Sequence, residues 1–351
     1  MKLKLLLFLL VLLINTFSSE AQLFKSENTE KVVNTLKSRI KLSGYVQGGY
    51  NCDREENSFD LKRAILMVDG QVTKNWRLFY MYEFKGGKTL EAYSEYKICE
   101  ALQLRLGQYK NPFSIENQLS PTVVEQINCY SLVSNYLAGI DGSDPLYGAH
   151  GGRDQGLMLH GNLFRFDENQ FHLSYQLAVM NGQGINQKDK NTQKDMIASV
   201  QYRPCREALI GASIQEGRGS AITPNPYVPS VEVGERYRRA RWSIGAEVKT
   251  SLADIRTEYI AGRDADVRSD GYYATGNLHL TRKIDAVLSY DHLNRNKEIG
   301  DAASQTNYVG GLQYWFYPRC RLQLVYTYRD ASKDPIARGG NLLQTQFQIR
   351  F

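Results

Sequence analysis

Apolar and polar residues alternate with a period of two along most of the chain. In residues 76–85, Trp76, Leu78 and Tyr80 share one face, and Arg77 lies on the other. The last residues, 341–351, alternate apolar side chains with glutamine and arginine in the same way. Because successive side chains of a β-strand point to opposite sides of a sheet, each of these segments predicts a strand with two unlike faces.

The pattern predicts about sixteen strands, which is an even number, as in single-chain bacterial outer-membrane barrels. We therefore expect an all-β fold, a transmembrane antiparallel β-barrel. The strands are expected at 39–51, 58–72, 76–85, 89–98, 102–110, 155–165, 170–181, 195–203, 207–216, 238–250, 252–262, 271–282, 284–295, 305–317, 319–330 and 341–351.

The lengths of the links between these segments support a barrel. Links at one end of the predicted barrel are all short, and most links at the other end are longer. The first two links at that other end are short exceptions. Outer-membrane barrels have short periplasmic turns and longer extracellular loops in the same way. A soluble sandwich has little reason to sort its loops in this way. The link at 111–154 is too long for a passive connection, and we expect it to fold into the barrel as an inward third loop. The other long links are 182–194, 217–237, 296–304 and 331–340.

The N-terminus resembles a secretory signal. Lys2 and Lys4 precede an apolar run from Leu5 to Ile14, and Ser19-Glu20-Ala21 provides small residues for cleavage. This run is too short to span a bilayer as a helix, although a retained anchor is the alternative. We expect a signal peptide at 1–21, a short periplasmic segment at 22–38 that could contain a helix, and a barrel at 39–351. The final residue, Phe351, ends an alternating strand, as is common in outer-membrane barrels.

Composition changes this picture only slightly. The mean hydropathy is −0.43, as in a soluble protein, but barrel strands are half lumen-facing and can have this average. The 23 tyrosines suit aromatic girdles at membrane interfaces, although a secreted β-sandwich is also rich in tyrosine. The five cysteines cannot all pair within the chain, and no Cys-x-x-Cys sequence suggests zinc or redox chemistry. We expect no metal and no cofactor.

Catalytic motifs are not found. The sequence has no Gly-x-Ser-x-Gly elbow and no His-Glu-x-x-His, and its five histidines are scattered. We therefore expect no enzymatic activity, although the members of a triad need only meet in space.

Several segments resemble the phosphate-selective porin O and P family. The most specific is Gly107-Gln108-Tyr109-Lys110-Asn111-Pro112-Phe113, and Phe59-Asp60-Leu61-Lys62-Arg63-Ala64 and Gly152-Arg153-Asp154-Gln155-Gly156 support it. The resemblance covers most of the mature chain. It implies a sixteen-stranded barrel, usually a homotrimer, with an inward-folded third loop and a basic lumen that selects anions.

The resemblance also implies an anion site at the constriction. Its residues would be the adjacent Lys62 and Arg63 of the second strand, with Lys110, Ser114 and Ser120 around the third loop. On a regular strand only one of Lys62 and Arg63 can point into the lumen, and we expect this to be Arg63. Where many family members have an acidic-Arg pair, this chain has Glu125-Gln126, which removes a bidentate phosphate donor. A broader anion or nutrient channel is therefore as well supported as phosphate selectivity.

Alternation places further arginines on lumen faces. They could attract anions into the channel, or they could be paired with acids across the strands. These residues are Arg77, Arg105, Arg241, Arg256, Arg321 and Arg329.

Two other polar runs have competing interpretations. The basic run 236–241 looks like a nucleic-acid patch, but in an exported barrel it would end an outer loop and bind anionic groups of outer-membrane lipid, so we expect no nucleic-acid partner. Asp141-Gly142-Ser143-Asp144 could hold calcium or cap the backbone.

Together these patterns predict an outer-membrane porin for passive diffusion of small, anionic solutes, with phosphate as one candidate. The alternative is a secreted or surface-attached β-rich binding protein.

Overall fold

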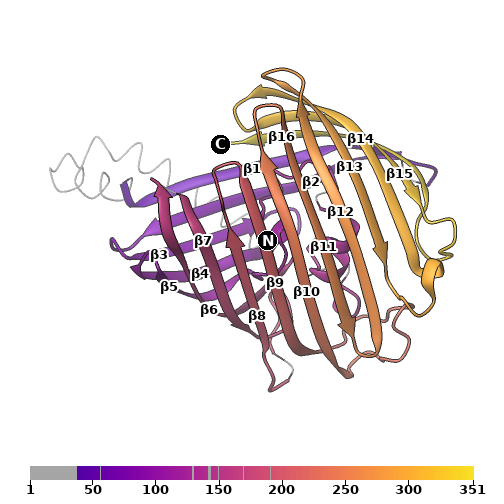
Figure 1. The fold of residues 1–351 in the computed structure, drawn as a ribbon, viewed down its shortest axis with the longest axis horizontal. Coiled ribbons are helices and arrows are strands. Elements are labelled where there is room, and N and C mark those ends of the chain that lie inside the picture. The colour runs from indigo at the N-terminus through magenta and orange to yellow at the C-terminus, as the bar shows by residue number, and fades with distance from the viewer. Residues whose placement is uncertain are drawn as a thin grey trace, which may run out of the picture.

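The chain folds into a closed antiparallel barrel (Figure 1). The computed structural model describes residues 38–351 except 56, 129, 141–143, 149, 169 and 190. Each strand pairs with its neighbours in sequence, and β1 closes the ring against β16. The strands in the described residues are β1 (Ile40–Cys52), β2 (Asn57–Gln71), β3 (Trp76–Glu83), β4 (Lys88–Cys99), β5 (Leu102–Lys110), β6 (Arg153–Asp167), β7 (Gln170–Met180), β8 (Asp195–Tyr202), β9 (Ala208–Ser220), β10 (Arg236–Lys249), β11 (Ala253–Asp264), β12 (Val267–His279), β13 (Ile284–Asn294), β14 (Ser304–Tyr317), β15 (Cys320–Asp330) and β16 (Gly340–Arg350).

The two faces of each strand differ as the alternation predicts. On β15 the side chains of Leu322 and Leu324 are exposed on the outside, whereas Arg321 and Gln323 are buried inside. Tyrosine rings contact one another from strand to strand on the outside, as in Tyr290–Tyr308 with ring centroids 5.4 Å apart. An apolar outer belt with an aromatic girdle is what a bilayer requires of a spanning barrel. The expected fold class is therefore confirmed, and the fold is that of an outer-membrane protein.

The predicted strands all exist, with ends that differ by about four residues at most. The link between β11 and β12 was predicted wrongly. The expected strand bounds left residues 263–270 between them. β11 ends at Asp264 and β12 begins at Val267, so only residues 265 and 266 join the two strands. The expected signal peptide and periplasmic helix lie in residues 1–37, outside the described residues. No helix in the described part of the chain is long and apolar enough to cross a membrane.

A β-bulge changes the expected geometry of β2. Gln47 of β1 pairs with Arg63, but the next residue, Gly48, pairs with Leu61, so Lys62 is an extra residue in the ladder. An extra residue shifts the phase of the alternation. Leu61 is exposed on the outside and Arg63 contacts the buried Gln47, so the phase changes at Lys62. The two basic residues are therefore not on opposite faces of a regular strand, as the sequence alone suggested.

The outer face predicts how stability depends on membrane depth. Leu324→Arg, near the middle of β15, should lower the free energy of unfolding by roughly 2–4 kcal/mol, because it places a charge in hydrocarbon. Leu280→Arg is the matched control, because Leu280 is also exposed but follows the last residue of β12. It should cost only about 0–1 kcal/mol, as for charges near the interface. Reversible unfolding in lipid vesicles measures both, and equal costs would contradict the depth assignment.

The sorting of link lengths predicts which end faces the cell exterior. In a background without native cysteines, Ser230→Cys in the β9–β10 loop should react with an impermeant thiol reagent on intact cells. Asn75→Cys in the β2–β3 turn should react only after the cells are opened. Both native side chains are exposed, so access and not burial decides the result. The reverse pattern would show that the barrel is inserted the other way round.

Candidate channel constriction

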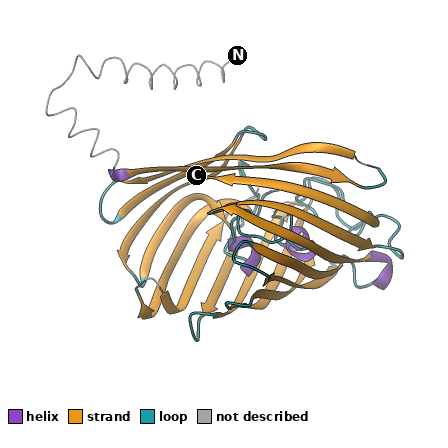
Figure 2. Ribbon diagram, turned by 90° about the horizontal axis from the view of Figure 1, so that it is seen from above, coloured by secondary structure: helices purple, strands orange, loops and turns teal. Residues whose placement is uncertain are grey.

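The β5–β6 loop, residues 111–152, lies inside the barrel (Figure 2). It contains two short helices, α3 (Ile115–Gln118) and α4 (Leu132–Leu137). The loop crosses the lumen, because its apolar side chains form one cluster with Tyr93 and Met158 on one wall and Ile260 and Tyr273 on the other. We call this segment the inner loop. The part of its expected inward fold that lies in the described residues is therefore observed.

Local hydrogen bonds explain the path of the inner loop. Ser114 has φ 68° and caps α3, with its hydroxyl accepting from the amide of Glu116 at 3.1 Å. Ser131 caps α4 in the same manner, as serine favours. At the neck, the side-chain amide of Asn117 donates to the carbonyls of Asn111 and Gly152 at 2.9 and 3.0 Å. These two hydrogen bonds hold together the ends of the inner loop, where it leaves β5 and enters β6.

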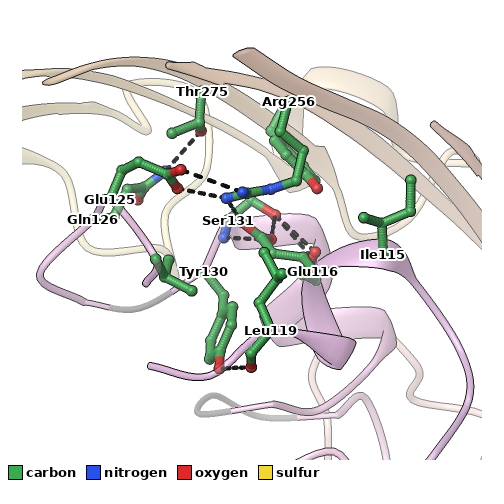
Figure 3. A network of polar contacts seen from close by, with 12 residues as sticks. Ile115, Glu116, Leu119, Glu125, Gln126, Tyr130, Ser131, Arg256 and Thr275 are labelled. Carbon is green, nitrogen blue, oxygen red and sulfur yellow. Dashed lines mark hydrogen bonds and ion pairs between the residues drawn. The ribbon is translucent and has the colours of Figure 1, made fainter. Parts of the chain in front are cut away.

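Arg256 of β11 provides an ionic attachment for the inner loop (Figure 3). Its guanidinium is 2.5 Å from a carboxylate oxygen of Glu125 and 3.6 Å from one of Glu116. The other oxygen of Glu116 accepts from the backbone and hydroxyl of Ser131 at 3.0 and 2.7 Å, which joins α3 to the start of α4. Arg256 is buried, so this ion pair is shielded from bulk water.

Arg241 of β10 makes a second attachment farther along the inner loop. Its guanidinium contacts Asp144 at 2.5 Å and Asp264 at 2.6 Å, and donates to the carbonyl of Leu137. Burial by itself would raise the pKa of the Asp144 carboxyl, but Arg241, His150 and Arg239 lower it well below its usual range. Asp144 therefore stays ionised and keeps its salt bridge at neutral pH. It is not free to act as the calcium ligand considered above, and residues 141–143 lie outside the described residues.

Glutamines of the inner wall also hold the inner loop, a role that the sequence patterns did not predict. Gln348 of β16 donates to the carbonyl of Thr122 at 3.1 Å, and Gln323 of β15 donates to that of Glu125 at 2.8 Å. Gln47 of β1 donates to the carbonyl of Pro121 at 3.2 Å. The polar face of residues 341–351 was the available signal for Gln348, but alternation alone does not distinguish a face that meets lumen water from one that meets a folded loop. Arg321 acts similarly and donates to the carbonyl of Val124 at 2.7 Å.

The remaining arginines predicted on lumen faces are partly accessible, and each has an acidic partner. Arg77 bonds Asp69 with two contacts of 2.8 Å, and Arg105 lies 2.5 Å from Glu95. Glu95 also accepts a contact of 3.1 Å from His160. At the loop-bearing end, Arg329 lies 2.9 Å from Asp53. Together with the buried Arg241 and Arg256, these contacts favour the pairing interpretation over a ladder of bare positive charge.

The five residues expected at the anion site separate into two groups. Ser114 is buried where the inner loop meets the barrel wall, and its hydroxyl donates to Glu258 of β11 at 2.8 Å, so it supports the loop. Ser120 lies at the partly exposed turn 118–121, and the ammonium of Lys110 donates to the carbonyl of Leu119 beside it. Arg63 reaches the same turn through Gln47, which it contacts at 3.1 Å. The structure thus brings Arg63, Lys110 and Ser120 to one turn, with Lys62 next to Arg63 in the chain.

One further basic residue belongs to this region. The guanidinium of Arg350 donates to the hydroxyl of Thr122 at 2.8 Å, from the end of β16. The sequence places Arg350 on the polar face of the last strand, but nothing in it indicates a contact with the inner loop. No group of acids, histidines and cysteines that could hold a metal occurs among the residues the structure describes.

Comparison with known proteins supports the fold. No protein-family model matches this chain, and no curated protein matches its sequence. Among solved structures, in-vitro folded OmpT of Vibrio cholerae has a TM-score of 0.61 at 10% identity. The outer membrane channel DcaP of Acinetobacter baumannii has a TM-score of 0.60 at 11% identity, and Salmonella typhi OmpF in complex with daunomycin has 0.61 at 11% identity. Each match covers 89% of this chain and 97% of the other. At such identities the likeness establishes a shared porin-type barrel fold.

The attachment at Arg256 predicts non-additive effects on stability. Arg256→Gln should lower the free energy of unfolding by about 3–5 kcal/mol, because it leaves a buried Glu125 without its counter-ion. The double variant Arg256→Gln/Glu125→Gln should recover part of this loss, since the closest carboxylate is then neutral, while Glu116 and Glu247, each 3.6 Å from Arg256, still lose their counter-ion. Reversible unfolding in detergent, with Glu125→Gln completing the cycle, measures the coupling. Additive effects would show that the pair does not hold the inner loop.

Proposed function

We propose that this chain forms a water-filled outer-membrane channel for passive diffusion of small solutes. The observation that carries the proposal is the position of the inner loop, which enters a closed barrel and is fixed to its wall by buried ionic and amide contacts. An inward loop narrows a channel without closing the strand ring, so it selects solutes by size and charge. A secreted binding protein would have no need for the apolar outer belt.

Charge at the turn supports an anion preference. Lys110 donates to the carbonyl of Leu119 in the turn 118–121. Arg63 donates to the side-chain oxygen of Gln47, which itself donates to the carbonyl of Pro121 in that turn. Two cationic side chains from different strands therefore lie at the same turn of the inner loop. Fixed cations in a narrow, low-dielectric passage concentrate anions. We therefore propose that this turn, with the hydroxyl of Ser120, is where anions are favoured.

Phosphate is one candidate solute, because the segments quoted above resemble phosphate-selective porins. Gln126, which stands where that family pattern has an arginine, donates its side-chain amide to the hydroxyl of Ser289 at 2.8 Å and supplies no guanidinium for phosphate. This favours a general anion or nutrient channel over a phosphate-specific one. The homotrimer implied by the resemblance stays a prediction.

Ion selectivity tests the proposal. In planar bilayers the wild type should conduct and prefer anions, and Arg63→Gln and Lys110→Gln should each lower the anion-to-cation permeability ratio by about two- to fivefold. Arg63→Lys keeps the charge and should keep the ratio. Lys74→Gln removes a charge from the exposed β2–β3 turn and is the matched control.

Two outcomes would contradict different parts of the proposal. A folded wild type that gives no conductance would overturn the channel itself. A conducting wild type that prefers cations, or unchanged ratios in both neutralised variants at low salt, would overturn the anion preference, because screening is weakest there.

A further inference from the structure

A basic groove lies on the outer face of the barrel, at the loop-bearing ends of β9–β12 (strands labelled in Figure 1). Its volume is about 550 Å³. The residues that matter here are Trp242, Tyr259, Arg263, Arg268 and Lys297, which we call the rim groove. Arg263, Arg268 and Lys297 are exposed and lie outside the lumen, so the proposed channel does not use them.

Two pairs of arginines face each other directly across neighbouring strands at this rim. Arg263 of β11 is paired in register with Arg268 of β12, and Arg218 of β9 is paired with Arg238 of β10. All four side chains are exposed on the outer face. Like charges directly opposite on one face of an antiparallel pair destabilise it. An anion that lies between the guanidinium groups of such a pair removes this repulsion.

The acids nearby neutralise this charge only in part. Glu298 contacts Arg268 at 2.8 Å, Glu216 contacts Arg238 at 2.6 Å, and Asp270 contacts Lys297. Arg263 has a backbone partner, the carbonyl of Ala265, at 3.2 Å, and the adjacent Asp266 accepts from Ser230 at 2.5 Å. These are exposed contacts, which water and salt weaken, so they exchange readily for a stronger anion.

Aromatic and apolar residues lie directly below the charges. The rings of Trp242 and Tyr259 are 5.4 Å apart, and the hydroxyl of Tyr259 donates to Asp270 at 2.7 Å. Ile244, two residues farther down β10 on the same face, is exposed as well. Cations above, aromatic rings in the middle and aliphatic side chains below match the layers of a lipid headgroup, interface and acyl chains.

We infer that the rim groove binds the phosphate groups of a phosphorylated lipid in the outer leaflet, with Arg263 and Arg268 as its main donors. Guanidinium groups bind phosphate with two parallel hydrogen bonds, and one phosphate between them removes their mutual repulsion. The inference rests on the proposed orientation, in which the long loops face outward. It also corrects the interpretation of residues 236–241: Arg239 and Arg241 point inward to buried acids, so only Arg236 and Arg238 of that run face lipid.

The test compares lipids that differ only in phosphate. Binding of bisphosphorylated lipid A and of its phosphate-free analogue to the purified barrel is titrated in non-ionic detergent and followed by thermal unfolding. The wild type should bind the phosphorylated lipid about tenfold more tightly than the analogue. Arg263→Gln/Arg268→Gln should lose this difference. Arg282→Gln/Lys283→Gln removes the same charge from the β12–β13 turn at the other end of the barrel, and should keep it.

The sign of the stability change separates binding from misfolding. Without lipid, Arg263→Gln/Arg268→Gln should unfold at the same temperature as the wild type or a higher one, because repulsion is relieved. With bisphosphorylated lipid A it should unfold at a lower temperature than the wild type. Equal affinity of the wild type for both lipids, or equal losses in the two double variants, would overturn the site.

Failure of this site and failure of the channel are distinguishable. Conductance and anion preference of Arg263→Gln/Arg268→Gln should equal those of the wild type, because these side chains lie outside the lumen. Phosphate-dependent binding by a barrel that does not conduct would support the lipid site and overturn only the channel. Conduction by a barrel that shows no phosphate-dependent binding would support the channel and overturn the lipid site.

Discussion

The inner loop stays in the barrel because the wall offers it buried hydrogen-bond donors. Arg256, Arg241 and Arg321 direct their guanidinium groups to carboxylates and carbonyls of the loop, and glutamines of β15, β16 and β1 add neutral donors. A loop buried in this way would otherwise leave many backbone groups unsatisfied. The apolar cluster that spans the lumen adds to these contacts, because it packs the same loop against both walls.

This arrangement divides the basic residues of the barrel by role. Those on the inner wall opposite α3 and α4 are buried and fix the loop. Arg77 and Arg105 lie on the inner wall of β3 and β5 and pair with Asp69 and Glu95. Lys110 contacts the loop turn directly and Arg63 reaches it through Gln47, and the outer arginines at the rim lie at the proposed lipid site. Different basic residues of the barrel thus attach the inner loop, form a candidate selectivity site and form a candidate lipid site.

Much of this fold could be predicted from the sequence, because one face of every strand meets lipid. That requirement imposes the period of two, and with it the number and order of the strands. The site was less predictable. The bulge at Lys62 cannot be recognised from the pattern of apolar and polar residues in β2, yet it alters which residues can face the lumen. The partners of Arg256 and Gln323 come from a loop more than a hundred residues away in the chain, and no local pattern specifies such contacts.

The central claim is that the inner loop sets the width of an aqueous channel. The loop ends suggest a direct test, because the amide of Asn111 donates to the carbonyl of Gly152 at 2.9 Å, so a short Gly-Ser link could replace residues 113–150 and leave β5 and β6 paired. Single-channel recording in planar bilayers should show discrete conductance steps for the wild type and clearly larger steps for the shortened variant. Equal steps in both proteins, or no steps in either folded barrel, would contradict the account.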